Sequence, residues 1–67
     1  MNKTKICRLP KIIRKTHLSR STIYNLIKAG KFPKQIKLSD RSVGWIEAEI
    51  EKWIQERVKK SRFGQEV

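Results

Sequence analysis

The sequence predicts two short helices with only three residues between them, and this spacing limits the folds open to the chain. Apolar residues at the i, i+3 and i+4 positions of one helix face begin at Leu9, and Pro10 stands in the first turn, where a helix tolerates proline. We therefore expect a helix over about residues 9–15. Since the next helix begins at Ser19, residues 16–18 are too few for anything but a tight helix-turn-helix corner.

The second helix has a signal at each end and contains no acidic residue. Ser19 is a good N-cap, because its hydroxyl can accept the amide of a residue two or three positions on, and Gly30 suits the left-handed position that follows a helix. At about 100° per residue, Ile23, Leu26 and Ile27 gather on one side. Such a helix buries one face and offers the other to an anion. The polar side chains that gather roughly opposite are Arg20, Ser21, Tyr24, Asn25 and Lys28.

Two residues with reactive side chains are expected to be structural. His17 stands in the corner, where glycine is usual, and histidine is among the residues enriched at positive φ. No carboxylate or thiol lies near it in the sequence to complete a catalytic site. Cys7 is the single cysteine, so neither an internal disulfide nor a zinc site can be built within one chain. We expect Cys7 to be a small buried residue, and we expect no metal and no cofactor.

The positive charge is concentrated in the first two thirds of the chain. Residues 1–45 contain 12 Lys and Arg and one acid, Asp40, whereas residues 46–67 contain five residues of each sign, so the net charge of +11 belongs to the first part. A one-sided basic field points to nucleic acid or, less often, to an acidic membrane. On the first helix we expect Lys11, Arg14 and Lys15 to carry their charges outward.

The second half of the chain predicts a hairpin followed by a third helix. Residues 35–38 and 42–45 flank a polar turn at residues 39–41, and two strands this short must pack on the helices. Ile46 begins a helical apolar period that continues to Val58. Acidic residues are concentrated in the first turns of this helix and basic residues near its end, as the helix dipole favours.

The apolar residues predict one small core. Phe32 is expected to plug the core under the corner, while Trp45 and Trp53 fall at positions that the local periods turn inward, so we assign them to packing and not to base stacking. A chain of 67 residues has room for one domain. The expected parts are a flexible segment at residues 1–7, the domain at residues 8–60 and a frayed tail at residues 61–67.

The order of helix, tight turn, basic helix, hairpin and helix predicts a mainly α fold with a small β-hairpin, a winged helix-turn-helix that binds DNA. The second helix can enter the major groove, where Arg pairs with guanine and Asn with adenine. Arg41, at the hairpin tip, can enter a minor groove, and basic residues that include Lys11 can hold phosphates. A solvated helix face and an ordinary polar turn are the plain alternatives. The expected DNA-binding residues are Arg14, Arg20, Ser21, Thr22, Tyr24, Asn25, Lys28, Lys31, Lys34, Lys37 and Arg41.

Other classes of function have less support in the sequence. There is no glycine-rich phosphate loop and no Ser/His/Asp set, and the helix dipole explains Glu47, Glu49 and Glu51, so we expect neither an enzyme nor a small-molecule substrate. No apolar stretch is long enough to span a membrane, and the first residues lack the apolar region of a signal peptide, so we expect a soluble intracellular protein. A small basic RNA-binding protein remains an alternative, although Tyr24 is the one aromatic residue expected to be exposed. A protein that binds anionic lipid is weaker still.

The chain resembles the AlpA family of small phage and prophage DNA-binding regulators. The residues that carry the resemblance are 8–10, 18–24, 30–34 and 43–50, together with Trp53. The resemblance implies a winged helix-turn-helix related to the MerR type and to phage excisionases, with residues 19–28 as the recognition helix and residues 37–41 leading into the wing. The chain departs from the usual pattern at His17, where glycine is common, and at Asn25, where arginine is common.

We therefore expect a sequence-specific DNA-binding regulator of transcription from a prophage or integrative element, acting in the bacterial cytoplasm and influencing excision. One small domain contacts few base pairs, so useful specificity requires several copies on repeated sites. The alternative within DNA binding is an architectural excision factor that bends attachment-site DNA for a phage-type integrase.

Overall fold

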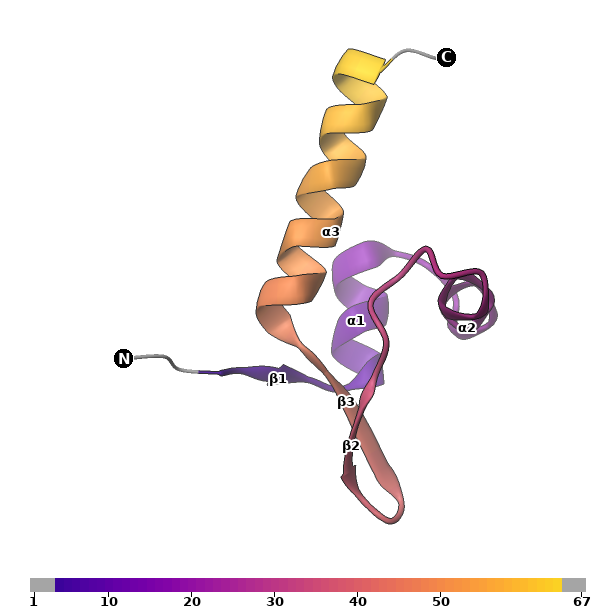
Figure 1. The fold of residues 1–67 in the computed structure, drawn as a ribbon, viewed down its shortest axis with the longest axis vertical. Coiled ribbons are helices and arrows are strands. Elements are labelled where there is room, and N and C mark those ends of the chain that lie inside the picture. The colour runs from indigo at the N-terminus through magenta and orange to yellow at the C-terminus, as the bar shows by residue number, and fades with distance from the viewer. Residues whose placement is uncertain (1–3, 65–67) are drawn as a thin grey trace.

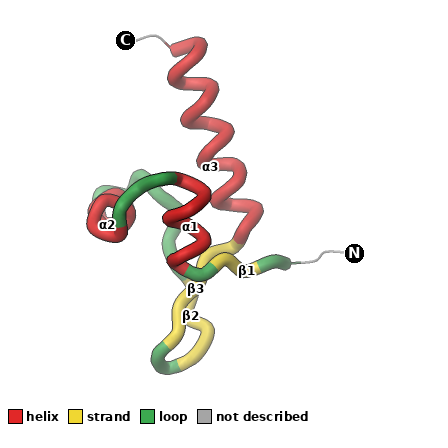
Figure 2. The backbone as a smooth tube through the Cα atoms, turned by 180° about the vertical axis from the view of Figure 1, so that it is seen from behind, coloured by secondary structure: helices red, strands yellow, loops and turns green. Residues whose placement is uncertain are grey.

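A computed structural model describes residues 4–64 of the chain, which form three helices and a small sheet (Figure 1). The elements in chain order are β1 (Ile6–Cys7), α1 (Leu9–Thr16), α2 (Arg20–Lys28), β2 (Ile36–Ser39), β3 (Ser42–Ile46), α3 (Glu47–Lys59) and a π-helical segment (Lys60–Gly64). Seen from both sides, α3 leaves the sheet in the direction opposite to the β2–β3 hairpin, and α2 stands to one side of α1 (Figures 1 and 2). The fold is mainly helical with a small antiparallel sheet, as the sequence predicts.

The corner between α1 and α2 has the backbone that the sequence predicts. His17 adopts the left-handed conformation with φ 60°, and its N–H donates to the carbonyl of Ile13 at 2.7 Å. The Thr16 hydroxyl donates to the carbonyl of Ile12 at 2.8 Å and accepts the N–H of Leu18 at 3.2 Å. These bonds satisfy backbone groups at the end of α1, so the chain can turn into α2 within three residues.

Both predicted ends of α2 are confirmed. The Ser19 hydroxyl accepts the N–H of Thr22 at 3.2 Å, which makes Ser19 the N-cap. Gly30 has φ 74°, and the N–H groups of Gly30 and Lys31 donate to the carbonyls of Ile27 and Leu26 at 3.0 and 2.8 Å. This pair of bonds is the Schellman motif, in which a left-handed glycine closes the helix.

The sheet has three strands in the order β1-β3-β2, all antiparallel, and one of them was not predicted. The two hairpin strands agree with the sequence analysis. The third, β1, pairs Ile6 with Ile46 and Cys7 with Trp45. The sequence analysis placed residues 1–7 in a flexible segment and did not anticipate this strand, and residues 1–3 lie outside the described part of the chain.

Gly44 allows the strands of the sheet to pack closely. A Cβ atom at this position would lie 2.6 Å from Cγ2 of Ile6 and 3.3 Å from the carbonyl oxygen of Cys7. Because real Cβ atoms essentially never approach as closely as 2.6 Å, a larger residue here would force the Ile6 side chain to shift and would crowd the backbone of β1.

The core lies between the helices and the inner face of the sheet. Trp45 is fully buried, and its indole N–H donates to the carbonyl of Pro33 at 3.0 Å. Trp53 packs against the core from its edge and remains partly exposed. The predicted core positions of Phe32, Trp45 and Cys7 are therefore confirmed, and Trp53 is a boundary residue. The buried hydrophobic side chains within residues 4–64 are Cys7, Ile12, Ile23, Phe32, Trp45 and Ile50.

The helical structure extends further toward the C-terminus than the sequence predicts. After α3 the chain continues in π-helical form over Lys60–Gly64. The flexible tail expected at residues 61–67 stays a prediction. Residues 65–67 of the expected tail lie outside the described part. No helix within residues 4–64 is long and apolar enough to cross a membrane.

Candidate nucleic-acid interface

The outer face of α2 presents the side chains that the sequence analysis selected for DNA. Ile23 is fully buried on the inner face, where Leu26 and Ile27 also pack against the core. The opposite face contains no acid. The exposed side chains on α2 are Arg20, Ser21, Thr22, Asn25 and Lys28, and Tyr24 is half-buried.

Tyr24 connects this outer face to the core. Its ring meets the ring of Trp45 edge-on, with centroids 6.3 Å apart and planes at 64°. The guanidinium carbon of Arg20 lies 5.6 Å from the centroid of the Tyr24 ring. A cation placed over an aromatic face is attracted to it, so Tyr24 holds Arg20 against the helix surface while leaving its N–H donors available.

Thr22 has a role in the helix cap as well as a place on the face. Its hydroxyl accepts a hydrogen bond from the Ser19 hydroxyl at 3.0 Å, while its N–H donates to the same Ser19 oxygen. Because the Thr22 hydroxyl acts there as an acceptor, its own hydrogen remains available to a phosphate or a base.

The remaining predicted contacts lie on elements around α2. Lys31 and Lys34 follow α2, Lys37 is in β2, and Arg41 is in the turn of the hairpin; all four are exposed. Lys34 and Lys37 line one shallow hollow of about 450 Å³, which Ile27 of α2 and Val43 of β3 also line. Residues of α2, of the segment that follows it and of the hairpin therefore line one hollow, which contains Lys34, Lys37 and one acid, Asp40.

Arg14 lies on α1, near the start of α2. It is exposed, and it lines a hollow together with His17 and Ser19, at the corner where α2 begins. Within residues 4–64, none of the predicted basic contacts forms an ion pair, because the ion pairs found there involve only Lys11 and Lys15. Their charges are available to an external anion.

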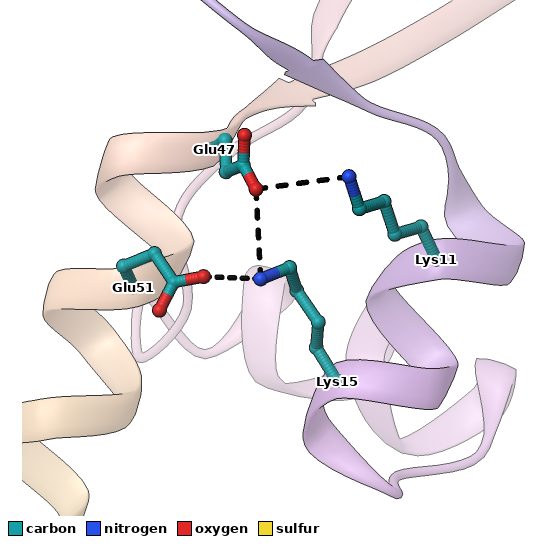
Figure 3. A network of polar contacts seen from close by, with 4 residues as sticks. All are labelled: Lys11, Lys15, Glu47 and Glu51. Atoms are coloured by element: carbon teal, nitrogen blue, oxygen red, sulfur yellow. Dashed lines mark hydrogen bonds and ion pairs between the residues drawn. The ribbon is translucent and has the colours of Figure 1, made fainter.

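The other two basic residues of α1 pair with α3. Lys15 is half-buried, so the expectation that it points outward is wrong, whereas Lys11 is exposed as expected. The ammonium group of Lys15 contacts the carboxylate of Glu51 and lies 3.6 Å from that of Glu47, and Lys11 lies 3.7 Å from Glu47 (Figure 3). The hydrogen bond to Glu51 raises the pKa of Lys15 above its ordinary value. Since Glu47 already neutralises Lys11, we leave Lys11 out of the proposed phosphate contacts.

Two cations at the end of α3 and just beyond it, which the helix dipole explains in the sequence, also lie beside Lys31. Arg57 and Lys60 line a groove together with Lys31. Their spacing along the chain from Trp53, at i+4 and i+7, is the signal that could have placed them on one side of the helix.

Within residues 4–64, no three residues among His, Cys, Asp and Glu lie together as metal ligands would.

Comparison with known proteins gives one family and two relatives. The family model described as "Prophage CP4-57 regulatory protein (AlpA)" matches residues 5–58. The DNA-binding transcriptional activator AlpA of Escherichia coli (strain K12) is 44% identical over an alignment of 61 residues, and the match covers 82% of this chain and 87% of the relative. The uncharacterized protein ORF88 of Enterobacteria phage P4 is 41% identical over 51 residues, which are 76% of this chain and 58% of that protein.

Proposed function

The chain belongs to the AlpA family of prophage regulatory proteins, and on that basis we propose that it is a sequence-specific DNA-binding activator of transcription. The family consists of regulators, which confirms that the chain is not an enzyme. The observation that carries the proposal is the exposed, acid-free outer face of α2, whose cations have no ion-pair partner within residues 4–64. The protein acts in the bacterial cytoplasm, where its DNA is.

We assign the fold to the winged helix-turn-helix class. The tight corner at His17 leads from α1 into α2, and the hairpin follows α2 after residues 29–35, which is the order of elements in a winged helix-turn-helix. In this assignment α2 is the recognition helix and lies in the major groove, while β2 and β3 form the wing. The exposed outer face of α2 and the exposed turn at Arg41 support the assignment.

The side chains on α2 have distinct roles in this proposal. Arg20 donates a pair of N–H bonds to guanine O6 and N7, and Asn25 bonds adenine at N6 and N7. Ser21 and Thr22 contact bases or phosphates near the start of the helix. Tyr24 positions Arg20, through the ring contact described above.

The basic residues around α2 hold the DNA backbone. Arg14, Lys28, Lys31, Lys34 and Lys37 neutralise phosphates on both sides of the groove, which fixes the register of α2 without reading sequence. Arg41 enters the adjacent minor groove from the tip of the wing, where a narrow groove concentrates negative potential.

A salt titration of binding tests the proposal. With about 5 to 7 phosphate contacts per copy, the log-log plot of affinity for duplex DNA against salt should have a slope near −5, because each contact releases about 0.9 counterion. Fluorescence anisotropy with duplex DNA and with RNA of the same sequence measures it. A slope near zero, or tighter binding to RNA, would reject the proposal in favour of the RNA-binding alternative.

We also propose that regulation by this protein influences excision of the element that encodes it. If the protein acts through transcription, its sites overlap a promoter, and purified polymerase transcribes the neighbouring gene more strongly when the protein is added without an integrase. Reconstituted excision with a purified integrase is the decisive comparison. Direct stimulation there, with no transcription, would make the protein an architectural excision factor that bends attachment-site DNA.

A further inference from the structure

A groove runs between α3 and the segment that joins α2 to β2, outside the outer face of α2. Two adjoining hollows of about 560 and 470 Å³ form it, and both are lined by Pro33, Trp53 and Glu56. Positive charge exceeds negative charge along its walls. The charged residues that line the groove are Lys31, Lys34, Lys52, Arg57 and Lys60, with Glu49 and Glu56.

Trp53 fixes the two walls of the groove to each other. Its indole N–H donates to the carbonyl of Lys31 at 2.7 Å, and its ring meets that of Phe32 edge-on, with centroids 4.8 Å apart. The guanidinium carbon of Arg57 lies 4.9 Å from the centroid of the Trp53 ring. The ring attracts this cation and leaves its five N–H donors for another partner, and a planar guanidinium suits phosphate oxygens.

The groove continues directly from the end of the proposed recognition helix. Gly30 and Lys31 close α2 through the Schellman bonds, and both residues also line the groove. Lys34, a proposed phosphate contact, lines the second hollow. A DNA backbone that Lys31 and Lys34 hold therefore passes the mouth of this groove.

We propose that the groove beside Trp53 binds a phosphate of the DNA backbone, with Arg57 of α3 and Lys60 just after it as its ligands and Lys31 opposite them. This inference rests on the proposed function, and it extends the DNA contact from α2 and the hairpin to α3. The helix dipole accounts for the position of basic residues at the end of α3, but it does not account for the stacking of Arg57 on Trp53 beside Lys31. Glu56 lies in the same groove and opposes the phosphate.

The chain offers a matched control for the test. Lys59 and Lys60 are neighbours of the same type, both exposed, but only Lys60 lines the groove. Lys60→Gln should weaken binding to duplex DNA severalfold and make the salt slope shallower by about 0.9, the value for one lost phosphate contact. Lys59→Gln should leave the slope unchanged, and Glu56→Gln should tighten binding.

Arg57 is tested with two variants, because it also packs on Trp53. Arg57→Gln should lower affinity for target and random DNA by the same factor, since a phosphate contact carries no sequence information. Arg57→Lys keeps the charge but loses the planar stack, so its affinity should fall between those of Arg57→Gln and the unchanged protein. Thermal melting of each variant identifies any loss that comes from unfolding.

The outcomes separate this inference from the proposed function. If the unchanged protein does not bind duplex DNA, the proposed function itself fails. If it binds, but Lys60→Gln and Lys59→Gln have equal effects on the salt slope, the groove is not a phosphate site. If the groove variants keep full DNA binding and lose activation in a reconstituted transcription reaction, the groove receives a protein, and the inference is overturned.

Discussion

The two lysines of α1 and the basic residues of α2 face different surroundings. Lys11 and Lys15 on α1 meet the glutamates at the start of α3, so their charges are neutralised within the protein. Arg20 and Lys28 on α2 are exposed and have no such partner within residues 4–64. The net charge of the chain therefore does not measure its capacity to bind an anion. Position relative to α3 decides whether a basic residue is neutralised within the protein or available to a partner.

The helices α1 and α2 pack on one core, so removing the largest buried side chain of that core should unfold the protein and abolish DNA binding. Trp45 is fully buried, contacts Tyr24 of α2 and lies in β3, which leads into α3. Trp45→Ala should cost about 3 to 5 kcal/mol of unfolding free energy, most of the stability of so small a domain. Thermal unfolding followed by circular dichroism measures it, with DNA binding lost in parallel.

Trp53→Ala is the comparison for this prediction. Because Trp53 is only partly buried, its replacement should cost less than that of Trp45. If Trp53→Ala were the more damaging of the two, the core would be centred on the contact of α3 with the 30–36 segment and not on Trp45.

Local signals in the sequence explain which elements could be predicted. The cap at Ser19, the glycine at Gly30 and the apolar periods act over a few residues, so the helices and the hairpin follow from the sequence alone. The strand β1 has only two residues and exists because it pairs with β3, about 40 positions away. A strand that short has no period of its own, so it cannot be recognised before its partner is known.

In the candidate interface, too, features of a single helix could be predicted from the sequence, and contacts between distant segments could not. The outer face of α2 is a property of one helix, and its residues could be selected from their spacing. The pairing of Lys15 with Glu51 joins residues 36 positions apart, and nothing in the spacing of charges along the chain reveals it. The groove beside Trp53 likewise depends on two distant segments that meet in the fold.

Substitutions on the outer face of α2, whose cations form no ion pair within residues 4–64, test whether this face reads the DNA sequence. Arg20→Ala and Asn25→Ala should each reduce discrimination between target and random duplex by about 1 to 3 kcal/mol, because each removes a pair of bonds to one base. Lys34→Ala should weaken binding to both duplexes alike. Competition binding with the two duplexes provides the measurement.

The α1 region supplies the control for this experiment. Lys11→Gln changes a residue that is exposed but already paired with Glu47, so it should affect DNA binding less than Lys34→Gln does. Equal losses from Lys11→Gln and Lys34→Gln would remove the distinction between the two regions. Equal losses of specific and random binding in Arg20→Ala and Asn25→Ala would mean that α2 is not the reading helix.

The next prediction concerns His17, in the turn between α1 and α2. His17 holds a left-handed backbone with φ 60°, which costs a residue with a Cβ atom about 1 to 2 kcal/mol. Glycine removes that cost but adds roughly 0.5 to 1 kcal/mol of chain entropy to the unfolded state. His17→Gly should therefore stabilise the protein by about 0.5 to 1 kcal/mol in chemical denaturation, with unchanged DNA affinity. His17→Val, with a β-branched residue at positive φ, should be destabilised, and a stable valine variant would argue against a strained corner.

The smallest effect is expected where charges are already paired. The hydrogen bond to Glu51 raises the pKa of Lys15 from its ordinary value of 10.5, so the folded protein holds this proton more tightly than the unfolded chain does. The resulting stability is fully present below pH 10.5 and is lost as the pH rises through the higher pKa of the folded state. Lys15→Gln should therefore lower the melting temperature slightly near neutral pH, and the difference from the unchanged protein should shrink above pH 10.5. Melting curves of both proteins between neutral pH and the alkaline limit test this, and the difference between them cancels the titration of the other lysines. A difference that stays constant across that range would show that Lys15 supports the fold through packing of its alkyl chain and not through its charge.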